Sequence, residues 1–259
     1  MSQFIPTDIT HHKPLAWVSQ GFIFSYRGSL QPFWREVGDL VEGFTVSRQL
    51  GEYRYARVWS DMRWQTLDEN SPGRLREQIK RAGGNRCYWK IDLVNKIETP
   101  DLSMEIVDLL PVREQQRASY IRVRCPMNVQ AEFLKELSFR VFEALPWCFG
   151  TAGYLFNYTL GKKDISFDQI WAWARRFWGV EVNDTESASW DALNGVLNVN
   201  WLTFLGQELL NEKLPTLNWG GPFTQRIKVF QLAHGLAAQA GPQPIIGDLN
   251  LMEDLSAYK

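Results

Sequence analysis

Histidine and cysteine are scarce in this chain, and their placement excludes most common catalytic and metal sites. None of the three histidines and three cysteines shows a metal-ligand spacing: His11, His12, His234, Cys87, Cys125 and Cys148. We expect the cysteines to be buried thiols of a reducing compartment. No H-E-x-x-H, G-x-S-x-G or phosphate-loop pattern occurs either. These absences predict a protein that is not an enzyme and that carries no catalytic site, metal or cofactor.

Signals for export or membrane insertion are also missing. The first residues, Met1 to Asp8, lack the basic start and apolar core of a signal peptide. No apolar run reaches the roughly 18 residues that a membrane-spanning helix needs. We therefore expect a cytoplasmic protein that does not contact a membrane. The polar segment 1–14, with two of the histidines, is expected to form a mobile arm, and His234 to lie in the core or a turn.

Charge is nearly balanced overall but not along the chain. The 28 basic and 29 acidic residues give a net charge of −1, which argues against a dedicated nucleic-acid binder. The segment from Glu52 to Lys90 contains nine basic and five acidic residues. The segment from Glu181 to Lys259 contains nine acidic and four basic residues. An acidic C-terminal third is either a solvated surface or a landing site for a basic partner.

Hydrophobic periodicity predicts an α+β protein with mainly antiparallel sheet packed with a few helices. Five strands are expected at residues 16–26, 87–97, 102–110, 119–125 and 150–160, with an edge strand or hairpin arm at 53–59. The closeness of three of these strands favours an antiparallel meander. Along residues 119–125, the side chains of Tyr120, Arg122 and Arg124 are expected on one side of the strand, with Ile121 and Val123 on the other. We expect one domain over 1–259, and the sequence leaves open whether this domain consists of two similar halves.

Helices are predicted in four places. Residues 31–50 are compatible with a short helix that contains Gly38 and Gly43, and residues 71–84 with a basic helix. Asn128 is the expected N-cap of a helix that runs to about residue 144. The pattern S-x-x-Q at 166–169 opens a further amphipathic helix that stops at Gly179.

The carboxylates that follow Glu181 in the sequence are the best candidates for a catalytic cluster in this chain. Asp184, Glu186 and Asp191 follow within ten residues, and Asp248 is a more distant candidate member. A metal-dependent hydrolase using Glu181, Asp184 and Asp191 is one interpretation, although no histidine or basic partner sits nearby. Asp248 also suits a helix N-cap. Arginines interleaved with aromatics, as in Tyr53 to Tyr55 and Arg86 to Lys90, keep nucleic-acid binding open as a second alternative.

Four ordered segments carry a family resemblance. They read G-T-A-G-Y at 150–154, R-F-W-G-V-E-V-N-D at 176–184, V-N-W-L-T-F-L at 199–205, and Q-A-G-P-Q-P-I-I-G-D-L-N at 239–250 before Ala257-Tyr258. The chain resembles the type VI immunity family in these segments, most strongly over 144–259. The resemblance implies a protein that protects a bacterium by binding and neutralising a cognate type VI secretion effector.

The resemblance also implies a mechanism and a partner. The effector would be a basic, nuclease-like toxin acting in the cytoplasm, and the immunity protein would occlude its active site or substrate path without contacting nucleic acid itself. Acidic side chains would imitate phosphates toward a basic cleft. The expected contact residues are Glu181, Asp184, Glu186, Asp191, Asp248, Glu253 and Asp254. Exposed tryptophans are expected to act as anchors, whereas Trp201 is expected in the core.

Overall fold

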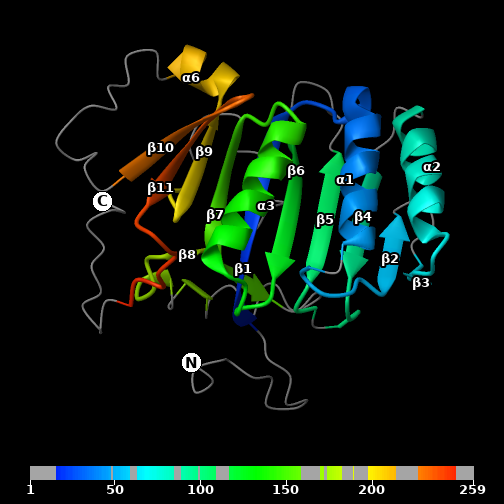
Figure 1. Cartoon of the computed structure of the whole chain (residues 1–259), viewed down its shortest axis with the longest axis horizontal. Coiled ribbons are helices and arrows are strands. Elements are labelled where there is room, and N and C mark those ends of the chain that lie inside the picture. Colours follow the sequence, from blue (N-terminus) through cyan, green and yellow to red (C-terminus); the bar gives the residue numbers. More distant parts are fainter. Residues whose placement is uncertain are drawn as a thin grey trace.

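The computed structural model of the chain (Figure 1) is built on one large sheet with helices against it. It describes residues 16–47, 49–58, 63–84, 89–98, 100–108, 117–158, 170–171, 174–182, 189, 198–213 and 227–248. The expected arm at 1–14 and Cys87 lie outside these ranges, as do residues 166–169 and 172–173 of the helix expected to stop at Gly179. The described part of that helix ends at residue 174, because the chain then turns and Phe177 forms a β-bridge with Asp248, so the expected end at Gly179 is wrong.

Within these ranges the sheet contains eleven strands, and they pair antiparallel with one exception. The strands are β1 (Ala16–Arg27), β2 (Tyr55–Val58), β3 (Gln65–Thr66), β4 (Trp89–Val94), β5 (Ser103–Asp108), β6 (Ala118–Cys125), β7 (Phe149–Tyr158), β8 (Val180–Glu181), β9 (Leu202–Gly206), β10 (Ile227–Leu232) and β11 (Gly235–Ala240). Their order is β10-β11-β9-β7-β1-β6-β5-β4-β2-β3, with β8 parallel to β7. The α+β class and the meander of β4, β5 and β6 are confirmed.

The helices that precede β7 in the chain cover one face of the sheet (Figure 1). The described helices are α1 (Trp34–Val46), which a short 3₁₀ turn η2 (Gln31–Phe33) precedes, α2 (Ser71–Gly84), α3 (Ala131–Ala144) and the short α6 (Gln207–Lys213) after β9. Helix α3 begins two residues later than expected. Its N-cap is Gln130 without a side-chain hydrogen bond, so the prediction of Asn128 as the N-cap is wrong.

The core lies between the sheet and these helices. Phe24 of β1 is its centre, with its ring centroid 4.9 Å from Phe204, 5.6 Å from Phe142 and 5.9 Å from Trp147. Aromatic packing of this kind adds stabilisation beyond the buried area. Trp201 is 1% exposed, which confirms its expected place in the core.

The opposite face of the central strands is charged, yet it is buried. Lys90 bridges Asp92 and Glu105, while Arg57 contacts Asp92 at 2.7 Å and Arg122 contacts Glu105 at 2.6 Å. Side-chain alternation along β6 is as predicted, but Arg122 is only 7% exposed. Charges of opposite sign on neighbouring strands make this burial tolerable, because each charge meets a partner.

Candidate functional site

The four segments that carry the family resemblance pack against one another. Trp178 and Gly179 donate their backbone N–H groups to the carbonyls of Gly247 and Ile246, at 3.1 and 2.8 Å. The indole N–H of Trp201 donates to the Gly241 carbonyl at 3.2 Å. The motifs thus form one scaffold, although they are far apart in sequence.

Glycine is required where these segments approach most closely. A Cβ at Gly179 would overlap the backbone carbonyl of Ile245. At Gly153, which has φ +154°, a Cβ would overlap the side chain of Asn200, whose amide donates to the Tyr154 carbonyl at 3.1 Å. These glycines therefore serve packing.

Two of the expected contact residues are buried and paired inside the chain. Glu181 is 7% exposed and accepts hydrogen bonds from the Thr151 hydroxyl and, at 3.3 Å, from the Asn198 amide. Asp248 is 6% exposed, and Arg176 donates to both its carboxylate oxygens at 2.8 and 2.7 Å. Both carboxylates hold the scaffold together. Their contact with a partner stays a prediction.

The other expected contact residues, Asp184, Glu186, Asp191, Glu253 and Asp254, lie outside the described residues. The two remaining acidic residues of the C-terminal third, Glu208 and Glu212 of α6, both pair with Arg27 at 2.8 and 3.0 Å. An acidic partner surface would therefore depend mainly on the two segments 184–191 and 253–254.

The structure gives little support to a metal site, a reactive cysteine or a nucleic-acid-binding face among the described residues. Of the proposed metal ligands only Glu181 is described, and the described residues contain no group of three His, Cys, Asp or Glu side chains that could hold an ion. Burial raises the pKa of the Cys125 thiol to about 12 and that of Cys148 to about 11, which disfavours the reactive thiolate. For nucleic-acid binding, Trp89 is 4% exposed and Lys90 belongs to the buried ion network.

Exposed aromatic residues are present near the scaffold. Trp171 is 58% exposed and Trp178 is 51% exposed. The Trp178 indole donates to the Arg175 carbonyl at 3.1 Å, so its ring has a defined position. The role of such residues as partner anchors stays a prediction. His234 lies in the turn between β10 and β11, as expected.

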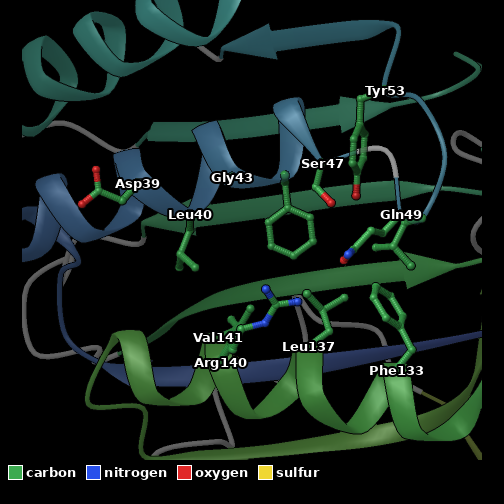
Figure 2. Close-up of a pocket in the computed structure, with 12 residues that line it drawn as sticks. Asp39, Leu40, Gly43, Ser47, Gln49, Tyr53, Phe133, Leu137, Arg140 and Val141 are labelled. Atoms are coloured by element: carbon green, nitrogen blue, oxygen red, sulfur yellow. The ribbon is translucent and has the colours of Figure 1, made fainter.

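A hollow on the helix-covered side is a second candidate site, which the sequence did not reveal. It has a volume of about 160 Å³ and lies between α1 and α3 (Figure 2). Leu40 and Phe44 line it from α1, and Phe133, Leu137 and Val141 line it from α3. A second, more open hollow shares Gln49, Leu50 and Phe133 with it and extends to residues 126–130. Together they form a groove, hereafter the α1/α3 groove.

Tyr53 gives this groove a polar group that lacks a partner. Its side chain is 4% exposed and packs edge-to-face on Phe44, with centroids 6.4 Å apart. Its hydroxyl has no hydrogen-bond partner within the described part of the chain. Figure 2 shows the hydroxyl turned into the hollow beside Ser47 and Gln49. Burial raises the pKa of Tyr53 well above its ordinary value, so the hydroxyl stays protonated and can donate.

Arg140 supplies an available positive charge to the same hollow. It is exposed on α3, and Figure 2 shows its guanidinium reaching towards α1. Among the described residues it has no ion pair or hydrogen bond. Asp39, on the other wall, is already paired with Arg76 of α2 at 2.6 Å. The free charge of the groove is therefore positive.

Taken together, the sheet and the packed segments of the C-terminal half define an α+β protein with a mainly antiparallel sheet. A family model described as "TsiV: Type VI immunity for VRR-NUC" matches residues 47–259. The chain therefore belongs to the TsiV family of type VI immunity proteins. The match includes residues 144–259, where the sequence resemblance is strongest, and begins well before them.

Similarity to individual proteins adds evidence on the fold. The chain is similar to the solved structure of Pseudomonas aeruginosa T6SS protein PA0821, with a TM-score of 0.71, 15% identity and coverage of 93% of this chain and 71% of that chain. At this identity the likeness shows a shared fold. A stretch of 123 residues, or 46% of this chain, is 24% identical to Protein TIC 214 of Oenothera berteroana and spans 11% of that protein.

No helix in the described part of the chain is both long and apolar enough to cross a membrane.

Proposed function

We propose that this chain binds a type VI secretion effector of the VRR-NUC type and neutralises it by occluding its active site or substrate path. The observation that carries the proposal is the family match over residues 47–259. In this proposal the chain acts in the cytoplasm as a stoichiometric inhibitor and catalyses no reaction. The high thiol pKa values of Cys125 and Cys148 support the second point, because those side chains are poor nucleophiles.

Electrostatics supports a basic nuclease as the partner. An enzyme that cleaves nucleic acid needs positive charge along its substrate path. Carboxylates of the segments 184–191 and 253–254 would meet this charge as phosphate mimics: Asp184, Glu186, Asp191, Glu253 and Asp254. Complementary charge mainly accelerates encounter, so its effect belongs to the association rate.

Co-expression tests this function. The reading frames beside the gene for this chain are screened for a VRR-NUC effector, which is then expressed with and without the chain in a bacterial host. We expect the effector alone to stop growth and the pair to grow. A catalytically inactive effector and a folded immunity protein of another family serve as controls. Growth arrest that persists when the chain is folded and in excess would overturn the proposal.

A further inference from the structure

The α1/α3 groove has a size, a buried donor and a charge that together specify an occupant. We infer that it receives a tyrosine side chain of the effector, with a carboxylate beside that tyrosine in the effector's structure. This inference rests on the proposed function, because it names the feature of the effector that this surface recognises. It adds an anchor site on the helix side of the sheet to the acidic segments already proposed.

The volume of the inner hollow fits one aromatic ring. A dry apolar cavity of roughly 150 Å³ is known to accommodate benzene, and this one has about 160 Å³. Pockets for drug-sized ligands are larger, from about 300 Å³. Walls formed by Leu40, Phe44, Leu137 and Val141 favour an apolar ring over a polar group. The hollow therefore matches a single anchoring side chain.

The buried hydroxyl of Tyr53 distinguishes tyrosine from phenylalanine. A buried polar group without a partner costs free energy, and this cost is recovered when a partner arrives. The phenol oxygen of an inserted tyrosine accepts the hydrogen bond that Tyr53 can donate. A phenylalanine ring would fill the same space and leave the hydroxyl unpaired.

The unpaired charge of Arg140 is the reason for placing a carboxylate of the effector beside the inserted tyrosine. Arg140 is the charged side chain of the hollow that lacks an ion pair among the described residues, because Asp39 is engaged by Arg76. A carboxylate next to the tyrosine would pair with its guanidinium through charge-assisted hydrogen bonds.

The surroundings can extend the contact beyond the anchor. A specific interface buries roughly 800 Å² on each partner, far more than one hollow supplies. The adjoining hollow has a volume of about 610 Å³ and continues the groove along residues 126–130. Met127 within that segment is 38% exposed, and Val46 at the end of α1 is 64% exposed. Apolar exposure beside a pocket is typical of an interaction surface.

Gly43 offers a way to block the groove without harming the fold. It lines the hollow from α1, and a Cβ placed on it would meet nothing within 4 Å. Gly43→Leu therefore places a side chain at the entrance while improving the helix propensity of α1. Gly73 of α2 also has open space around an added Cβ. Gly73→Leu is thus a matched control on another helix.

The experiment measures affinity for a catalytically inactivated VRR-NUC effector by calorimetry, with thermal unfolding of each variant as a check. We expect Gly43→Leu to weaken binding at least about 30-fold and to unfold at the same or a higher temperature. Gly73→Leu should bind like the original chain. Tyr53→Phe should weaken binding about 3- to 10-fold without loss of stability, and Arg140→Gln about tenfold.

Mutations in the effector identify the residue that enters the groove. Exposed tyrosines of the effector are replaced one at a time by phenylalanine, and one replacement should be non-additive with Tyr53→Phe in a double-mutant cycle. Unchanged affinity of Gly43→Leu would overturn the groove inference while the immunity function stands. An effector that fails to bind the original chain would overturn both. If Gly43→Leu alters self-association and not effector affinity, the groove serves a second copy and the inference is wrong.

Discussion

Glu105 is the residue on which the buried charges of the sheet converge. Burial alone would raise the pKa of its carboxyl group, but Arg122 and Lys90 outweigh burial and lower the pKa to about 2. The neighbouring Lys90 shows the converse effect: burial opposes its charge, yet Glu105 and Asp92 raise its pKa. The charged forms of both groups therefore stabilise the folded state relative to the unfolded chain.

Removing one partner from this network should destabilise the fold strongly. We expect Glu105→Gln to lower the free energy of unfolding by about 3–5 kcal/mol, because it leaves the buried Arg122 and the largely buried Lys90 with less compensation. Chemical denaturation measures the change. Asp101→Asn in the exposed Lys96–Asp101 pair is the matched control and should cost far less. Equal losses in the two variants would contradict this account of the network.

The lowered pKa of Glu105 predicts that the free energy of unfolding depends on pH. Since its folded pKa is lowered, Glu105 contributes stability that is fully present above its unfolded pKa of roughly 4.3 and is lost as the pH falls towards about 2. Unfolding free energies measured across this window should fall less steeply for Glu105→Gln than for the original chain.

Sequence could predict which charges share a face, but not that the face is buried. The alternation of Tyr120, Arg122 and Arg124 followed from the strand period. The pairing of Arg122 with Glu105 depends on strand register, which sets residues of β5 and β6 opposite each other. Burial of this face depends on tertiary packing, and alternation alone does not encode it.

At the scale of elements, segments 174–182 and 227–248 are held together by the pair Arg176–Asp248 and by backbone hydrogen bonds. We expect Asp248→Asn to accelerate hydrogen exchange at the Trp178 and Gly179 amides, which donate to Gly247 and Ile246. Asp68→Asn, which breaks an exposed Arg–Asp pair at the start of α2, should leave these two amides unchanged. Unaltered exchange in Asp248→Asn would show that the backbone contacts suffice.

The longer strands of the first 160 residues were predictable, whereas the later strands, the helix ends and the groove were not. Patterns of apolar residues located β1, β2 and β4 to β7 because each pattern is local. The start of α3 was missed because Asn128 looks like a cap, while Gln130 fills that position without a side-chain bond. The groove requires α1 and α3 to lie side by side, and this tertiary arrangement has no signal in the local sequence pattern.

At the scale of the whole molecule, the uneven charge distribution predicts how association responds to salt. Reversing Asp184, Glu186 and Asp191 to lysine should slow association with the effector about tenfold or more at low salt. The difference should shrink as ionic strength rises, because salt screens exposed charges. Stopped-flow or surface-based kinetics at several salt concentrations measures this.

A control with the same change in net charge separates location from total charge. Glu69, Glu77 and Asp101 lie in the other half of the chain, and all three are exposed. Their reversal to lysine should change the association rate much less. Equal slowing in both triple variants would show that net charge alone matters and would contradict a partner-facing role for residues 184–191.

The most direct test of inhibition by binding is a titration of the purified VRR-NUC effector's nuclease activity with this chain. The account predicts that activity falls in proportion to added chain and reaches its minimum near equimolar amounts. It also predicts that the effector is recovered intact when the complex is dissociated. Nuclease activity that stays unchanged in a large excess of folded chain, or an effector that is chemically altered by catalytic amounts of it, would contradict the central claim.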